Sequence, residues 1–207
     1  MSERKDTEMN TYFVRQYEAK DYEAVDRVCF GAGGEEGADN PLMQNVSVKE
    51  AMLTVFSHYY IEQVPEHCYV AVNEQDEVQG YVLCDPDFAE YEKRLREKYI
   101  ESSSNPAIGY VAEGTISGMR RAAPEYPAHL HIDLLPGAQG QGVGTRLIGT
   151  LKEHLEKLGV PGLFLCVSTD NEGAIAFYRK LGFTELYRDE SQAAMGIRLQ
   201  PENESRS

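Results

Sequence analysis

A glycine-rich turn, Gln139–Gly144, constrains the fold of this chain more than any other feature. An apolar segment that ends at Leu134 and Leu135 precedes it, and the segment after it repeats apolar residues at helical spacing: Val143, Leu147, Leu151, Leu155 and Leu158. A glycine turn between a strand and a helix lets backbone approach an anion and offers the unpaired N–H groups of the first helical turn. The pattern therefore predicts a phosphate-binding turn, with an ordinary tight connection as the alternative.

The spacing Gln-x-x-Gly-x-Gly differs from a dinucleotide fingerprint and from a P-loop, because it contains neither G-x-G-x-x-G nor Gly-Lys-Ser/Thr. A second block follows at Asn171–Phe183, with Phe177 and Tyr178 placed before Leu-Gly-Phe. Together, in this order, the two blocks resemble the two hallmarks of the GNAT acetyltransferase superfamily. The resemblance implies an α/β GNAT fold, with a mixed, mostly antiparallel, twisted sheet and helices on both faces.

The same resemblance implies acetyl-CoA as co-substrate. The residues expected to bind it are Leu134, Leu135, Gln139, Gly140, Gln141, Gly142, Val143, Gly144, Thr145, Asn171, Ala174 and Tyr178. By the family pattern Tyr178 is the general acid that protonates the departing thiolate, and Asn171 either caps a helix or contacts the pantetheine arm. A main-chain N–H near Leu134 is expected to polarise the thioester carbonyl, since acyl transfer develops charge on that oxygen.

The strand before the glycine turn carries titratable side chains on one face. Alternation places His129, His131 and Asp133 on the same side. This face is either an active-site wall or an internal hydrogen-bonded network. Transfer of acetyl to an amine needs a base, and His131 or Asp133 is the expected catalytic residue, ahead of His129. Asp133 is alternatively a carboxylate that holds the amine or orients His131.

Composition narrows the class of partner. The chain has 207 residues, which suits one domain, and a net charge of −14, which argues against nucleic acid or an anionic membrane as partner. Four cysteines lie far apart without C-x-x-C spacing, so reduced thiols, no metal site and a cytoplasmic location are expected. Cys166 is interpreted as a core residue rather than a nucleophile. No apolar segment suggests a signal peptide or a membrane span.

Residues 1–10 are expected to be disordered, 11–200 to form a single GNAT domain, and 201–207 to be a mobile tail. Periodicity and turn residues predict strands at 11–15, 67–72, 78–84, 129–135, 163–167, 183–187 and 194–199, and helices at 21–30, 47–60, 88–99 and 143–158. Asp21 is the expected N-cap of the first helix, and Ser47–Glu50 has the form of a capping box. The loop 31–40 is either a specificity element or a solvated connection.

An insertion at about 85–127 is longer than most connections between neighbouring strands, and its second half, after a Ser-Ser-Ser-Asn-Pro break, is weakly patterned. With Glu66–Val70, Gln79–Leu83 and Tyr126–Asp133 it is similar to the acetyltransferase-like domain of O-GlcNAcase and its free-standing bacterial relatives, over residues 12–199. In the animal domain the CoA loop has degenerated, whereas here the loop is intact.

The sequence therefore predicts direct acetyl transfer from acetyl-CoA to a primary amine on a small molecule or a peptide. A CoA-binding or partner-binding pseudo-acetyltransferase is the main alternative, and a protein-lysine (histone) acetyltransferase is a further one. The pattern identifies neither the acceptor nor the oligomeric state.

Overall fold

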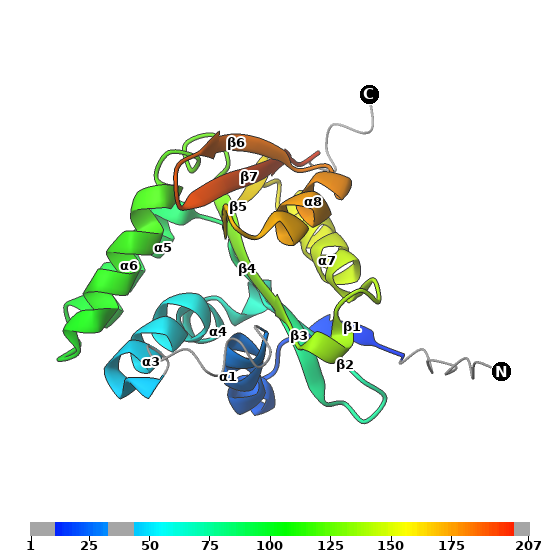
Figure 1. The fold of residues 1–207 in the computed structure, drawn as a ribbon, viewed down its shortest axis with the longest axis horizontal. Helices are drawn as coiled ribbons and strands as arrows, with labels where there is room; N and C mark the ends of the chain where they lie inside the picture. The colour runs from blue at the N-terminus through cyan, green and yellow to red at the C-terminus, as the bar shows by residue number, and fades with distance from the viewer. Residues whose placement is uncertain (1–10, 33–43, 201–207) are drawn as a thin grey trace.

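A twisted sheet runs through the middle of the molecule (Figure 1), in a computed structural model that describes residues 11–32 and 44–200. Within those residues the sheet has seven strands in the order β1-β2-β3-β4-β5-β7-β6. The strands are β1 (Phe13–Gln16), β2 (Tyr69–Val72), β3 (Val78–Asp85), β4 (Ala128–Leu134), β5 (Gly162–Ser168), β6 (Thr184–Arg188) and β7 (Gln192–Arg198). Every neighbouring pair is antiparallel except β4 and β5, which run parallel. The predicted mixed, mostly antiparallel sheet is confirmed.

Helices cover both faces of this sheet. One face carries α1 (Tyr22–Gly31), α3 (Val46–Leu53), α4 (Tyr59–Gln63), α5 (Phe88–Leu95) and α6 (Pro106–Met119), and the other carries α7 (Val143–Lys157) and α8 (Glu172–Lys180). Strand β3 shows how the two cores are divided, since Tyr81 and Leu83 belong to the first core and Val82 and Cys84 to the second. Alternating side chains on a strand buried on both faces give this division.

The caps of the first two helices differ from the prediction. Asp21 precedes α1, but its carboxylate accepts hydrogen bonds from Arg15 at 2.7 and 2.9 Å and from the Glu18 N–H, so it does not cap the helix. Helix α3 begins one residue before the expected capping box, because the Asn45 side chain accepts from the N–H groups of Ser47 and Val48. A π-helical turn, Thr54–His58, joins α3 to α4.

The connection from β3 to β4 contains α5 and α6. Phe88, Tyr91 and Leu95 are buried along one face of α5, as the spacing predicts. Helix α6 corresponds to the weakly patterned segment, in which helical periodicity gave no prediction. Asn105 caps it, and the same side chain donates to the Ser47 carbonyl and to Glu50 of α3, so α6 is attached to α3. Residues 1–10, 201–207 and most of the 31–40 loop lie outside the described residues, so those predictions are untested.

Candidate active site

The two parallel strands separate after a short paired stretch. Strands β4 and β5 pair at Ala128 with Leu163 and at His129 with Phe164, and no pairing follows although both strands continue. In Figure 1, β4 runs diagonally through the molecule, while β5 lies with β6 and β7 at one end. The N–H of Leu135 bonds to the Gln79 carbonyl of the β3 edge, so the N–H of Leu134 points toward the gap beside β5. The gap therefore offers a backbone donor where the sequence predicts one.

A cleft of about 690 Å³ lies between the end of β4, the glycine turn and the start of α8, and we call it the glycine-turn cleft. Ten of the twelve predicted cofactor-binding residues line it together: Leu134, Gln139, Gly140, Gly142, Val143, Gly144, Thr145, Asn171, Ala174 and Tyr178. Ala32, Ile132, Asp133, Gly173 and Phe177 complete the lining. The structure thus brings the strand end, the glycine turn and the start of α8 to one site.

The N-terminus of α7 opens into this cleft without a side-chain cap. Its N-cap residue, Gly142, has a φ of 75°, and Gly140 has a φ of 72°, a left-handed conformation that favours glycine. A Cβ on Gly144 would lie 3.0 Å from the Phe177 ring, so glycine also permits α7 and α8 to pack closely. Uncapped N–H groups and the positive end of the helix dipole suit a phosphate at this position.

Leu135 and Gln141, the other two predicted cofactor residues, do not line the cleft. The Gln141 side chain turns back and donates to the Gly137 carbonyl, which also accepts from the Tyr12 hydroxyl at 3.0 Å. Leu135 lies close to Gly31 at the end of α1. Gln141 therefore supports the turn and Leu135 packs near α1, so the geometry does not favour a side-chain role in binding for either residue.

Tyr178 and Asn171 reach the cleft from α8. Tyr178 is 7% exposed, and burial together with the charge of Asp133 raises the pKa of its hydroxyl, which therefore keeps its proton at neutral pH. Asn171 caps α8, because its Oδ1 accepts from the Ala174 N–H at 3.0 Å. Of the two roles that the sequence left open for Asn171, the structure shows the cap.

The polar face of β4 divides into two environments. His129 is fully buried against the rings of Tyr60, Tyr91 and Phe88, and its Nε2 lies 3.0 Å from the Tyr60 hydroxyl. Burial lowers the pKa of His129 to about 3, so its ring is neutral in the folded protein. His129 belongs to an internal network, whereas His131 and Asp133 are partly exposed, with side-chain exposures of 28% and 23%.

Tyr81 connects those two residues. Its hydroxyl donates to Asp133 Oδ2 at 2.6 Å and lies 3.3 Å from His131 Nδ1, while Nδ1 and Oδ2 are 3.7 Å apart. Burial raises the pKa of the Asp133 carboxyl, and the nearby His131 and the Tyr81 hydroxyl oppose that shift. Sequence patterns do not indicate Tyr81, because only the register of β3 against β4 places it opposite Asp133.

His131 also lines a second hollow, of about 340 Å³, on the side of β4 that faces α6; we call it the α6 hollow. Its other lining residues are Phe56, Tyr60, Gly114, Thr115, Met119, Leu130, Cys166, Val167, Ser168, Ser191 and Gln192. Cys166 is half-buried there rather than a fully enclosed core residue, and burial raises the pKa of its thiol to about 11. A protonated thiol is a poor nucleophile, which agrees with its exclusion from the predicted chemistry.

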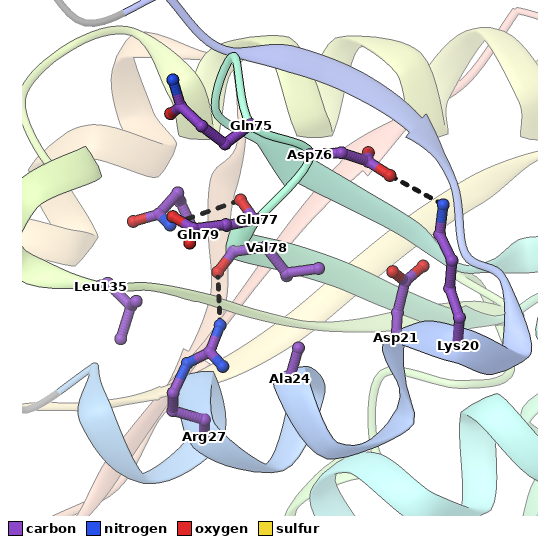
Figure 2. Close-up of a pocket in the computed structure, with 10 residues that line it drawn as sticks. All are labelled: Lys20, Asp21, Ala24, Arg27, Gln75, Asp76, Glu77, Val78, Gln79 and Leu135. Atoms are coloured by element: carbon purple, nitrogen blue, oxygen red, sulfur yellow. Dashed lines mark hydrogen bonds and ion pairs between the residues drawn. The ribbon is translucent and has the colours of Figure 1, made fainter.

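Figure 2 shows a third hollow, of about 460 Å³, between α1 and the β2–β3 hairpin. Its charged groups already have partners in the fold. Lys20 pairs with Asp76 at 2.7 Å, Arg27 donates to the Val78 carbonyl at 3.1 Å, and Asp21 pairs with Arg15. These contacts hold the hairpin against α1, and the hollow contains none of the predicted catalytic residues.

Residues 11–32 and 44–200 contain no cluster of three or more His, Cys, Asp or Glu side chains that could hold a metal ion. None of the helices in those ranges is both long enough and apolar enough to span a membrane.

Comparison with known proteins identifies the family. Residues 40–183, most of the chain, match the acetyltransferase (GNAT) family. The chain belongs to this family. Among solved structures, SsHAT has a TM-score of 0.78 and 27% sequence identity, over 91% of this chain and 98% of that chain.

Two curated acetyltransferases show shorter matches to this GNAT chain. Mycothiol acetyltransferase of Streptomyces avermitilis is 43% identical over 61 residues, which are 27% of this chain and 20% of that protein. The N-alpha-acetyltransferase RimI of Mycobacterium tuberculosis is 39% identical over 82 residues, which are 39% of this chain and 48% of that protein. The chain thus spans about a fifth of the first relative and about half of the second. The predicted GNAT membership and fold are confirmed, while kinship with the O-GlcNAcase domain stays a prediction.

Proposed function

We propose that this protein is an acetyl-CoA-dependent N-acetyltransferase that moves acetyl directly from the thioester to a primary amine. One observation carries the proposal: the uncapped, glycine-bounded N-terminus of α7 opens into the same cleft as Tyr178 and Asp133. A phosphate cradle and two proton-transfer groups in one cleft match the needs of acyl transfer from CoA. The names of the mycothiol and N-alpha acetyltransferase relatives support acetyl transfer to an amine.

Each part of the cleft has an assigned role in binding. The N–H groups of Gly140–Thr145 hold the pyrophosphate, the gap between β4 and β5 takes the pantetheine arm, and the Leu134 N–H receives the thioester carbonyl. A backbone donor fixed in a strand needs no reorganisation as negative charge develops on that oxygen. Gln139 supports this edge, because its side chain donates to the carbonyls of Leu134 and Ala32 at 3.0 and 3.2 Å.

Two proton transfers complete the reaction. An ammonium cannot attack a carbonyl, so the acceptor first gives a proton to a base, for which His131 and Asp133 are the candidates. As the carbon–sulfur bond breaks, the thiolate takes the Tyr178 proton. His131 faces the α6 hollow and Asp133 the glycine-turn cleft, so we assign the acceptor to the α6 hollow and acetyl-CoA to the cleft.

We infer a single GNAT domain over 11–200, in which the 85–127 insertion supplies one wall of the α6 hollow through Gly114, Thr115 and Met119. The four cysteines are free thiols, which supports a reducing compartment such as the cytoplasm.

The test is an assay of thiol release from acetyl-CoA with a panel of amines that includes a small amine, an amino sugar, a polyamine and a lysine peptide. Tyr178→Phe should bind acetyl-CoA as the parent does but turn over about 100-fold or more slowly, since a positioned acid contributes about 10²–10⁴-fold. Tyr110→Phe, at a tyrosine that is 85% exposed on α6, is the matched control and should be fully active. Turnover by Tyr178→Phe at the parent's rate would remove Tyr178 from the mechanism. Acetyl-CoA binding without turnover on any amine would favour the pseudo-acetyltransferase, and turnover on the peptide alone would favour a protein-lysine acetyltransferase.

A further inference from the structure

Tyr81 lies between the two candidate bases, and the proposed proton transfers give it no role. It is fully buried on β3, directly across from Asp133 in the β3–β4 register. Its hydroxyl is within hydrogen-bond distance of both Asp133 Oδ2, at 2.6 Å, and His131 Nδ1, at 3.3 Å. One hydroxyl therefore joins the carboxylate of the glycine-turn cleft to the imidazole of the α6 hollow.

The single proton of the Tyr81 hydroxyl determines the direction of these two hydrogen bonds. A tyrosine hydroxyl has one hydrogen to donate and lone pairs with which to accept. The shorter contact is to the carboxylate, which is acceptor-only when ionised and makes the stronger, charge-assisted bond. The hydroxyl proton therefore goes to Asp133, and the Tyr81 oxygen faces His131 Nδ1 as an acceptor. Nδ1 then carries the hydrogen of the neutral ring, which leaves the lone pair on Nε2.

We infer that Tyr81 is a positioning residue that selects the His131 tautomer with a proton on Nδ1, so that Nε2 is the base that takes the acceptor's proton. This inference rests on the proposed function. The amine proton moves to Nε2, the freed nitrogen lone pair attacks the thioester carbon, and the imidazolium is stabilised through Tyr81 by the charge of Asp133. Nε2 has no hydrogen-bond partner within residues 11–32 and 44–200, so nothing in that part of the chain competes for its lone pair.

The surroundings keep this arrangement at neutral pH. Burial and the charge of Asp133 hold the pKa of Tyr81 well above its usual value, so the hydroxyl stays a donor. Cys29 of α1 lies beside Tyr81, and burial raises the pKa of its thiol to about 12, so it adds no charge. Burial and the charge of Asp133 also raise the pKa of Tyr178 on α8, so its hydroxyl stays protonated. Phe56 of the π-helical turn packs against the His131 ring, with ring centroids 5.1 Å apart.

The direct test needs no acceptor. Heteronuclear NMR of the protein labelled in its histidine rings distinguishes a protonated ring nitrogen from an unprotonated one, and the His131 signals are assigned by their loss in His131→Gln. The parent protein should show a protonated Nδ1 and an unprotonated Nε2 at alkaline pH, and Tyr81→Phe should move the population toward Nε2–H. Tyr91→Phe is the matched control, because Tyr91 is equally buried but its hydroxyl has no partner among the described residues. It should leave the His131 tautomer unchanged.

Kinetics separate positioning from a purely structural role. Tyr81→Phe should leave the Kd for acetyl-CoA unchanged and lower kcat about tenfold or more, a part of the 10²–10⁴-fold that a positioned base contributes. An Nε2–H tautomer in the parent, or a tautomer that Tyr81→Phe leaves unchanged, would overturn the inference. A parent protein that turns over no amine would instead count against the proposed function, and the NMR result would still decide the tautomer.

Discussion

The pH dependence of stability tests whether His129 is buried as a neutral ring. The side chain is fully buried, its Nδ1 has no partner among the described residues, and its ring lies 4.4 Å from that of Tyr91. Burial penalises the charged form and lowers the pKa to about 3, against about 6.5 in an unfolded chain. Above pH 6.5 the ring is neutral in both states and costs nothing. Between pH 6.5 and pH 3 only the unfolded state binds the proton, so stability falls as the pH falls.

The size of this effect follows from the shift. Each pH unit below 6.5 removes about 1.4 kcal/mol, so His129 alone lowers the free energy of unfolding by about 2 kcal/mol at pH 5. His129→Leu is similar in size and cannot titrate. The difference in unfolding free energy between His129→Leu and the parent should therefore move in favour of the variant by about 2 kcal/mol between pH 7 and pH 5.

Urea unfolding at a series of pH values measures that difference. Tyr60→Phe is the matched control, because it removes the same hydrogen bond but leaves His129 in place, so its difference from the parent should not depend on pH. A pH-independent difference for His129→Leu would refute the reasoning, and it would mean that the ring is protonated or solvated in the folded protein.

Two further substitutions test the cleft. Gly142→Val forces a left-handed φ on a branched residue, which should lower the free energy of unfolding by about 1–2 kcal/mol. It should also weaken acetyl-CoA binding about 100-fold or more, because each hydrogen bond to a charged group contributes about 1.5–3 kcal/mol. Gly149→Ala, farther along α7 where nothing lies within 4 Å of the added carbon, is its control in calorimetric titrations; equal affinities for the two variants would contradict the phosphate assignment. In urea titrations, Asn171→Ala should lower the free energy of unfolding by about 1 kcal/mol through loss of the α8 cap. Asn171→Asp should keep the cap and therefore the parent's free energy of unfolding. Equal losses in both Asn171 variants would mean that the cap contributes nothing.

Local pattern was enough to predict the strand, turn and helix around Gln139–Gly144. Glycine conformation, helical periodicity and the start of a helix each depend on residues close together in the chain, so the sequence pattern predicts them. The same holds for the start of α8 at Asn171. Ten predicted residues therefore meet in one cleft.

Features that depend on distant elements were not predictable in the same way. His129 and His131 share one strand face, and the packing of α4 and of α5 from the insertion buries the first and not the second. Tyr81 meets Asp133 through the pairing register of β3 and β4, which depends on two strands far apart in the sequence. Gln141 belongs to the motif, yet its side chain bonds to the Gly137 carbonyl instead of lining the cleft.

Acetyl-CoA binding is the step on which every assigned role depends. Calorimetric titration of the full chain with acetyl-CoA should show saturable binding at one site, with free CoA also bound, because the phosphate cradle at Gly140–Thr145 recognises the part that the two ligands share. Absence of binding at millimolar acetyl-CoA would contradict the assignment of the cleft, and would leave the protein as a member of the family that recognises some other partner.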